Sequence, residues 1–509
     1  MKPAQRITSA SGPWPLHDTA GSRAIEGLAA ARVAPHALMQ RAGLAVARLA
    51  IALAPHAERV WIAAGPGNNG GDGFEAAAHL QRCGKQALVT ALGDAARRPA
   101  DAAASLARAQ AAGVDIQTHL PDALDCDLAI DALLGLGSTR APGGAIADAL
   151  RRFNDHSGPR LAVDLPSGLD TDRGTALGNV AARASHTIAL LTLKPGLFTA
   201  QGRDLAGQVW FDDLACAEAA AEVAPRAWLG GADAARALQG PRPHAQHKGR
   251  YGDVIVVGGA AGMAGAALLA GRAALAAGAG RVYVCALDPA APGLDAQWPE
   301  LMLRPTLWRD DPSLLATATV ICGCGGGDAV RAALPLLLTR AARLVLDADA
   351  LNAIAADTAL QALLSARAAR GQATVLTPHP LEAARLAGIE HASEIQADRL
   401  GHAERLAARY GCVVLLKGSG SVIAAPGQPS LINASGNARL ASAGTGDVLA
   451  GWLGGLWSAT QAQAQLLSPQ RVAQGAAWRH GAAAEGGEEH GPLTASQLLH
   501  RLTARSVQL

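Results

Sequence analysis

Residues 60–84 read VWIAAGPGNNGGDGFEAAAHLQRCG. An uninterrupted apolar run at 60–64 is followed by a glycine-rich stretch at 65–73 and then by a segment of helical length at 73–84. A continuously apolar strand followed by a helix is typical of parallel sheets that are covered by helices on both faces. This stretch therefore predicts an α/β fold, in which ligands bind beyond the carboxyl ends of the strands.

The same alternation of apolar runs and helical segments continues along the chain. We expect further strands at 128–131, 161–164, 187–193, 254–257, 282–286, 319–322, 344–347, 374–377 and 413–416. Glycine, proline or charged residues stand where these strands end, namely Gly65, Asp131, Asp164, Lys194, Gly258, Gly323, Asp347, Pro378 and Lys417. Residues at that edge of a parallel sheet are the first candidates for a functional site.

A change in composition divides the chain. After residue 214 the sequence becomes rich in alanine, then in glycine and proline, and a new strand signal begins at Asp253. A length of 509 residues also fits two or more domains. We expect a first domain at 1–225, a linker at 226–243 and a second domain at 244–509.

Charge and apolar patterning exclude several classes of protein. The 44 basic and 42 acidic residues leave a net charge of +2, which argues against a nucleic-acid partner. No secretory signal or membrane span is expected, because the most apolar early stretch, 37–54, contains Gln40, Arg41 and Arg48. The seven scattered cysteines lack the spacing of a zinc site, and free thiols favour the cytoplasm.

The strongest motif of the second half is GNARLASAGTGD at 436–447, which leads into an apolar segment at 448–457. Small residues at the start of a helix let backbone N–H groups approach an anion, and the helix dipole adds to the attraction. Asp447 would stand beside a bound phosphate, where a carboxylate can accept the proton of an attacking hydroxyl. The alternative is a glycine-rich turn in which Asp447 merely caps the helix.

Other strand ends of this half carry compatible residues. Lys417 and the small residues after it, through Ser421, suit a clamp on a nucleotide phosphate or ribose, and His379 stands between two prolines after another predicted strand. Glycine-rich turns follow the strands at 254–257 and 319–322. Each feature alone is weak evidence, and a histidine in a proline turn is usually structural.

Together, the motifs at 247–252, 258–267, 346–352, 377–380, 416–418 and 443–447 resemble the ADP-dependent NAD(P)H-hydrate dehydratase family. The resemblance implies a ribokinase-like α/β domain that uses ADP or ATP with Mg²⁺, and Asp447 as the catalytic base. It implies a nucleotide site formed by Lys417, Gly418, Ser419, Gly420, Ser421 and Gly446, and a substrate site that includes Gly265, Ala266, Gly327 and His379. Cys324 and Leu381 depart from the family pattern, which has proline and glycine there.

In the first half, the glycine-rich stretch 65–73 suits a pyrophosphate, and its two asparagines offer amide oxygens to a hard cation. Asp131 precedes a second loop of this kind at 135–140, and Asp164 ends another predicted strand. Tight strand-to-helix turns and acids that cap them are the alternative. Three such loops at one sheet edge are better explained by a binding site.

These motifs resemble the NAD(P)H-hydrate epimerase domain, a Rossmann-like three-layer fold, over about 14–214. The resemblance implies Asp164 as the catalytic acid or base and K⁺ bound by Asn69, Asp131 and Ser167. The implied substrate-binding residues are Asn68, Asn69, Gly70, Gly71, Asp72, Gly135, Leu136, Gly137, Ser138, Thr139, Arg140 and Ala141. Gln40 and Glu75 depart from the family pattern, which has glutamate and an apolar residue there.

The two resemblances together imply a bifunctional repair enzyme. It would interconvert the R and S forms of hydrated NAD(P)H and dehydrate the S form, converting ADP to AMP and phosphate. Its partners would be small molecules and further copies of itself, with no nucleic acid or membrane. The alternative is a ribokinase-like small-molecule kinase fused to a non-catalytic dinucleotide-binding domain.

Overall fold

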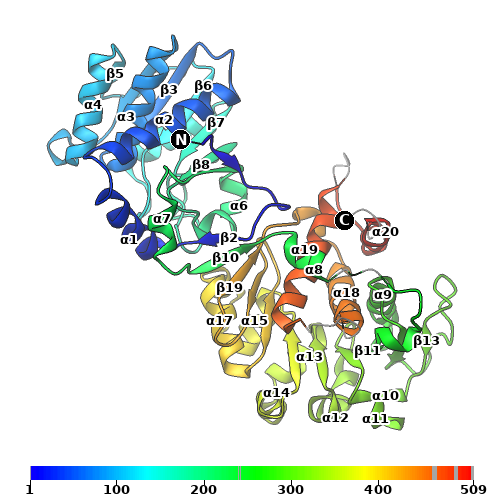
Figure 1. The fold of residues 1–509 in the computed structure, drawn as a ribbon. Helices are drawn as coiled ribbons and strands as arrows, with labels where there is room; N and C mark the ends of the chain where they lie inside the picture. The colour runs from blue at the N-terminus through cyan, green and yellow to red at the C-terminus, as the bar shows by residue number, and fades with distance from the viewer. Residues whose placement is uncertain (1, 239, 241, 461–466, 487–490, 506–509) are drawn as a thin grey trace. The chain divides into compact units, whose positions relative to one another are not determined.

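A computed structural model describes residues 2–238, 240, 242–460, 467–486 and 491–505. The chain divides into two compact units, one of Met1–Thr8 and Trp14–Ala227 and the other of Ser9–Pro13 and Trp228–Leu509 (Figure 1). The segment 226–243, expected as a linker, holds strand β10 (Ala227–Gly230) and helix α8 (Asp233–Ala237). Its apolar side chains, including Leu229 and Ala235, are buried, which explains why it forms regular structure.

The first unit contains an eight-stranded sheet in the order β1-β9-β8-β7-β6-β3-β4-β5. All neighbouring pairs are parallel except β1 with β9. The strands are β1 (Gln5–Arg6), β3 (Arg59–Ala64), β4 (Gln86–Ala91), β5 (Asp115–Gln117), β6 (Leu128–Ala132), β7 (Arg160–Val163), β8 (His186–Leu190) and β9 (Gln208–Asp212).

Helices cover both faces of this sheet. Val60 and Ile62 of β3 pack into a core with α1 (Thr19–Ala30), α2 (Ala37–Leu53) and α3 (Asn68–Arg82). Trp61 and Ala63 of the same strand pack into a separate core with α5 (Gly144–Asp155). Burial on both faces is why the strand is apolar throughout, and it confirms the predicted three-layer α/β arrangement.

The second unit contains the strand order β13-β12-β11-β14-β15-β16-β17-β18-β19-β10. Pairing is parallel from β13 to β17 and antiparallel from β17 to β19. The strands are β11 (Asp253–Gly258), β12 (Arg281–Ala286), β13 (Met302–Leu303), β14 (Thr319–Cys322), β15 (Arg343–Leu346), β16 (Ala373–Leu376), β17 (Val413–Leu416), β18 (Val422–Ala424) and β19 (Ser430–Asn433).

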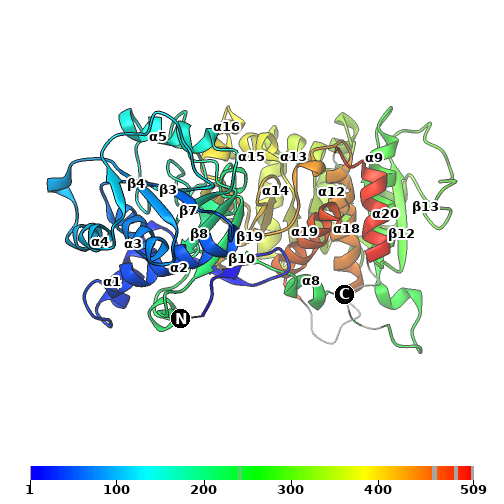
Figure 2. The ribbon, with the colours of Figure 1, turned by 90° about the horizontal axis from the view of Figure 1, so that it is seen from above.

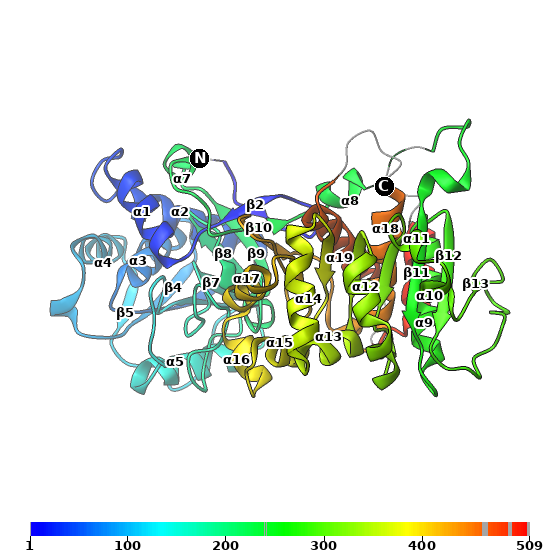
Figure 3. The same cartoon turned by 90° about the horizontal axis from the view of Figure 1, so that it is seen from below.

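This sheet is also covered on both faces. Val375 and Leu415 point into a core with α9 (Ala264–Ala276), α18 (Thr445–Ala459), α19 (Pro469–Glu485) and α20 (Ala495–Arg505) (Figure 2). On the other face Arg367 of α14 (Thr358–Ala369) donates to Thr374, the neighbour of Val375. Helices α12 (Leu334–Arg340) and α17 (Arg399–Tyr410) pack with α14 (Figure 3).

Each strand predicted from an apolar run is present, with its ends shifted by at most a few residues. The helix expected from residue 73 instead begins at Asn68, so the residues expected as a loop form its first turns. In the described part of the chain, no helix combines the length and apolarity needed to cross a membrane.

Candidate active sites

The first unit contains a pocket of about 550 Å³ at the carboxyl edge of its sheet. Its lining includes many of the predicted substrate residues, namely Asn68, Asn69, Asp72, Gly135, Leu136, Gly137, Ser138 and Asp164. The other predicted residues, Gly70, Gly71, Thr139, Arg140 and Ala141, are outside this lining. The structure thus brings three separate predicted loops to one cavity.

The start of helix α3 forms one wall of the pocket. Gly67 is the residue before the helix, and Asn68 and Asn69 begin its first turn, where unpaired backbone N–H groups and the helix dipole attract anions. A side chain at Gly70 would collide with the carbonyl of Gly65. Glycine is therefore required there for close packing of the helix on the strand end.

Asp164 follows strand β7 and is held in an unusual conformation. Its φ of 66° lies in the left-handed region that non-glycine residues seldom occupy. Lys194 forms an ion pair with its carboxylate and also donates to the carbonyl of Leu190 at 3.0 Å. The Lys194 side chain is only 2% exposed. Strained backbone held by a buried ion pair is common at functional sites, and it fixes the carboxylate at the pocket wall.

Two further acids lie near Asp164 in the pocket. Burial raises the pKa of Asp72 well above its usual value, and the charges of Asp164 and Glu26 add to the effect. Desolvation at the pocket wall also raises the pKa of Glu26, again with a contribution from Asp164. Carboxyl groups whose pKa is raised by burial and by neighbouring charges are common at functional sites.

Hydrogen bonds connect the three predicted potassium ligands to one another, directly or through the carbonyl of Leu134. Ser167 donates to Asp131 through its hydroxyl at 2.6 Å and its backbone N–H at 2.8 Å. Asn69 donates through Nδ2 to the carbonyl of Leu134 at 3.1 Å, and the Ser167 hydroxyl contacts the same carbonyl. The Asn69 Oδ1 atom is buried without a hydrogen-bond partner in the structure. Burial raises the pKa of Asp131 to about 6.

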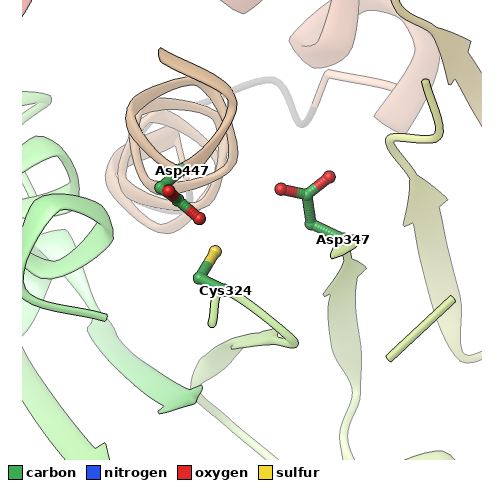
Figure 4. A group of neighbouring side chains, drawn as sticks. All are labelled: Cys324, Asp347 and Asp447. Carbon is green, nitrogen blue, oxygen red and sulfur yellow. The ribbon is translucent and has the colours of Figure 1, made fainter. Parts of the chain in front are cut away.

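In the second unit Asp447 lies in the first turn of helix α18. The turn begins at Gly444, whose φ of 84° favours glycine. A carboxylate oxygen of Asp447 lies within 4.8 Å of a carboxylate oxygen of Asp347 and of the Cys324 Sγ atom (Figure 4). Asp347 follows β15, and Cys324 follows β14. The ends of two parallel strands and the start of a helix thus bring these three side chains together. Asp447 stands at the helix start, as the sequence predicted.

Lys417 connects this point to the neighbouring strands. Its ammonium group lies 2.7 Å from Asp347 Oδ1 and 3.9 Å from Glu382 Oε2, and Thr377 donates to the same Asp347 oxygen at 2.8 Å. Burial lowers the pKa of Lys417, but the charges of Asp347 and Glu382 outweigh it and the pKa is raised. Lys417 therefore carries a positive charge near the N-terminus of helix α18.

The environment of Asp447 suits proton transfer. Burial, followed by the charge of Asp347, raises its pKa to about 6, while Cys324 and Lys417 act in the opposite direction. A general base is most effective when its pKa lies near the working pH. The pKa of the Asp447 carboxyl group thus lies close to neutral pH.

The remaining residues predicted for this unit have different settings. Gly265 and Ala266 lie in the first turn of α9, and Gly446 follows Thr445 at the start of α18. The Gly327 N–H donates to Asp349 Oδ2 at 2.9 Å. The segment from Lys417 to Ser421, which also contains Gly418, Ser419 and Gly420, forms the turn between β17 and β18.

His379 caps helix α15 (Pro380–Ala387). Its Nδ1 accepts from the N–H groups of Leu381 and Glu382 at 3.1 and 3.3 Å, and the Glu382 carboxylate in turn accepts from the His379 N–H. Because Nδ1 is an acceptor, the ring proton is on Nε2, which lies 3.1 Å from Glu382 Oε1. Its ring is thus fixed by structural hydrogen bonds, as is usual for a histidine in a proline turn.

Several residues of the two sites were not predicted from the sequence. Arg23 and Glu26 line the first pocket from α1, and the sequence gives no signal for them because they belong to the polar face of an ordinary amphipathic helix. Lys194 and Asp347 stood at predicted strand ends, but nothing in the sequence indicates that they pair with Asp164 and Lys417.

The four departures from the family patterns also have defined settings. Glu75 is 2% exposed and forms an ion pair with Arg108 of α4 (Ala100–Ala111). Cys324 is fully buried, and Leu381 is 40% exposed. Gln40 is exposed on α2, and nothing in the structure explains its replacement of glutamate.

Comparison with known proteins identifies both halves of the chain. Residues 254–504 match the family described as NAD(P)H-hydrate dehydratase, and residues 35–196 match the family described as YjeF-related protein N-terminus. A solved structure of an ADP/ATP-dependent NAD(P)H-hydrate dehydratase from Bacillus subtilis, co-crystallized with ATP and Mg²⁺, is 28% identical. It covers 54% of this chain and 95% of its own, with a TM-score of 0.45.

Two relatives extend over both units. The bifunctional NAD(P)H-hydrate repair enzyme Nnr of Escherichia coli is 38% identical over 465 residues, which are 88% of this chain and 84% of the relative. A bifunctional NAD(P)H-hydrate repair enzyme of Leishmania braziliensis is 35% identical over 455 residues, 82% of this chain and 80% of the relative. The predicted resemblance and fold class are confirmed, and the kinase alternative is disfavoured. The chain belongs to the family of bifunctional NAD(P)H-hydrate repair enzymes.

Proposed function

We propose that residues 1–225 catalyse epimerisation of hydrated NAD(P)H and that residues 244–509 catalyse its ADP-dependent dehydration. The observation that carries the proposal is the position of Asp447, whose carboxylate lies at a helix start beside the Asp347–Lys417 pair. A base and a fixed cation at an anion-binding helix end are the parts that phosphoryl transfer needs.

In the second unit, Asp447 accepts the proton of the C6 hydroxyl of the S hydrate while that oxygen attacks the terminal phosphoryl group of ADP. Bond formation to the C6 oxygen releases AMP. Phosphate is a far better leaving group than hydroxide, so the C6–O bond then breaks as the ring nitrogen donates its lone pair. The resulting iminium loses a proton from C5 to solvent, which restores the C5–C6 double bond. The products are NAD(P)H, AMP and phosphate, or ADP in place of AMP when ATP is the donor.

The nucleotide site consists of the helix start at Gly446 and the turn from Lys417 to Ser421, which contains Gly418, Ser419 and Gly420. The hydrated dinucleotide lies toward Gly265, Ala266, Gly327 and the exposed part of His379. Asp347 and Asp349 provide carboxylate oxygens of the class that Mg²⁺ prefers, so these residues fit the ion. When bound, Mg²⁺ neutralises charge on the phosphates of the nucleotide.

In the first unit, Asp164 is the acid or base at the epimerised carbon, and Lys194 positions it. The pyrophosphate lies at the start of α3, against Asn68 and Asp72, and at the loop from Gly135 to Ala141. Asn69 Oδ1, a buried acceptor with no partner, fits K⁺, and Asp131 and Ser167 complete the oxygen ligands. When bound, K⁺ would supply positive charge between the segments that carry Asn69, Asp131 and Ser167.

Loss and return of water through an iminium is the route we propose for inversion at C6. Incorporation of oxygen-18 from solvent into the product tests this route. Epimerisation without such incorporation excludes it and leaves the assignment of Asp164 intact.

The proposal is tested by following the NADH absorbance of the chemically hydrated cofactor with and without ADP. With ADP, we expect recovery of NADH from both epimers. The Asp164→Ala variant should convert only the S fraction on the time scale of the assay, and the Asp447→Asn variant should convert neither. Normal turnover by either variant contradicts the role given to that residue.

The setting of the protein in the cell is a further part of the proposal. The free cysteines of the structure favour a reducing cytoplasm. We also propose a homo-oligomer, which light scattering on the purified enzyme tests directly, since a monomer mass would contradict it.

A further inference from the structure

Cys324 occupies a turn that holds its side chain rigidly inside the second unit. The turn follows β14, and Gly323 and Gly325 on either side have φ values of 118° and 58°. The Gly259 N–H donates to the Cys324 carbonyl at 2.9 Å, which ties the turn to the end of β11. The side chain is fully buried and directed toward the two acids of the site (Figure 4).

The three side chains form a compact set of metal-type ligands. Cys324 Sγ and one carboxylate oxygen each from Asp347 and Asp447 all lie within 4.8 Å of one another. In a tetrahedral site, metal–sulfur and metal–oxygen bonds of about 2.3 and 2.1 Å place neighbouring ligand atoms roughly 3.5 Å apart. Side-chain movements of about 1 Å therefore complete three corners of such a site and leave the fourth open.

The hydrogen bonds of Asp347 leave it available to an ion. Lys417 and Thr377 both donate to Oδ1, and among the described residues Oδ2 accepts no hydrogen bond. The side chain is only 2% exposed, and Oδ2 is the Asp347 oxygen that neither Lys417 nor Thr377 engages. A divalent ion bound by three anionic ligands leaves one negative charge, which Lys417 balances without moving.

We propose that Cys324, Asp347 and Asp447 form a binding site for a thiophilic divalent cation of the Zn²⁺ class. Thiolate sulfur selects such ions over Mg²⁺, which prefers oxygen ligands only. Binding forms the metal–sulfur bond and releases the thiol proton to solvent. If Asp447 is the base of the proposed dehydratase, an ion on its carboxylate also blocks proton acceptance and inhibits that reaction.

Titration of the full-length, untagged enzyme with Co²⁺ under reducing conditions tests the site without any assay of activity. Wild type should develop a thiolate-to-cobalt charge-transfer band in the near ultraviolet, and Cys324→Ala should lose it. Cys83→Ala is the matched control, because it removes an exposed cysteine of the other unit and should keep the band. Absence of the band in wild type, or an unchanged band in Cys324→Ala, overturns the proposal.

A second variant covers the case in which Cys324→Ala does not fold. Cys324→Ser keeps the size of the side chain but replaces the soft sulfur, so it should bind Mg²⁺-class ions only and give no band. A band in folded Cys324→Ser equal to that of wild type also overturns the proposal.

Inhibition by Zn²⁺ tests the functional consequence. With free Zn²⁺ set by a metal buffer, the concentration that halves ADP-dependent NADH recovery should rise at least about tenfold in Cys324→Ala, since even second-shell changes cost that much affinity. An unchanged value overturns the inhibitory role. A cobalt band in an enzyme that lacks dehydratase activity instead refutes the proposed function and leaves the metal site standing.

Discussion

Replacement of Lys194 by methionine removes the cation that faces Asp164 while keeping the length of the side chain. Lys194 is 2% exposed and Asp164 14% exposed, so the pair is largely withdrawn from water. Removal of one partner of a buried pair costs about 3–5 kcal/mol. We take the lower end, about 3 kcal/mol, because the open pocket lets water reach part of the Asp164 carboxylate. The Lys194 hydrogen bond to the Leu190 carbonyl is lost in the same change.

Calorimetry of the full-length chain measures this cost. For a unit of this size, about 2–4 °C of melting temperature correspond to each kcal/mol, so the transition of the first unit should fall by roughly 6–12 °C. The double variant Lys194→Met/Asp164→Asn removes both charges and should recover about 2 kcal/mol relative to Lys194→Met alone, because no unpaired carboxylate is left.

Activity assays separate positioning from stability. At a temperature where Lys194→Met remains folded, recovery of NADH from hydrated cofactor should stop after the S fraction, while the initial ADP-dependent rate stays that of wild type. The dehydratase of the same chain is thus an internal control. A coupling energy below about 0.5 kcal/mol in the double-variant cycle, or normal epimerisation by folded Lys194→Met, refutes the reasoning.

Three other changes have defined outcomes. Asp447→Asn should lower the ADP-dependent rate about 10²- to 10⁴-fold, which is the usual contribution of a general base, and should leave epimerisation intact. Retention of more than a tenth of the wild-type rate argues against the role of Asp447 as the base. His480 donates through Nε2 to the Thr445 carbonyl at 2.9 Å, and burial lowers its pKa from 6.5 to about 4. Because the folded state favours the neutral imidazole, the contribution of His480 to stability is complete above pH 6.5 and falls by about 3 kcal/mol as the pH drops to 4. The His480→Gln variant should therefore show a smaller change of calorimetric stability between pH 6.5 and 4 than wild type. K⁺ should raise the melting temperature of wild type relative to tetramethylammonium, and Asn69→Ala should remove this effect whereas Asn68→Ala, on the same helix turn, should keep it.

Much of the fold could be predicted because it depends on local patterns. Strands buried on both faces must be apolar at every position, as Val60–Ala64 are, and such runs are visible without any tertiary information. The rule that ligands bind at the carboxyl ends of parallel strands then indicated Asp164, Asp347 and Lys417. The start of α3 was placed too late because glycines at 70, 71 and 73 disfavour a helix locally. Only the tertiary structure shows that each lies too close to a neighbour for a side chain, Gly70 to Gly65, Gly71 to Met39 and Gly73 to Ala132.

The partners of the site residues could not be predicted, since they depend on which strands are neighbours in the sheet. Lys194 meets Asp164 because β8 lies beside β7, and Lys417 meets Asp347 across the end of β16. Arg23 and Glu26 come from a helix whose sequence resembles any exposed amphipathic helix. Their place in the pocket is set by the packing of α1, which no local pattern encodes.

The effect of a departure from the family pattern depends on the side chains that the new residue contacts. Glu75 replaces an apolar residue in a buried helix, and Arg108, 29% exposed on the adjacent helix, supplies the charge that makes the burial tolerable. An ion pair can be exchanged for apolar contact at little net cost to stability, and the charge of Glu75 also contributes to the raised pKa of Asp72. Cys324 faces acids instead, and its hydrogen bond to Asp447 lowers the pKa of that carboxyl group. It lies between the carboxylates of Asp347 and Asp447, so the replacement changes the chemistry of the site itself, from oxygen ligands alone to a mixture of oxygen and sulfur.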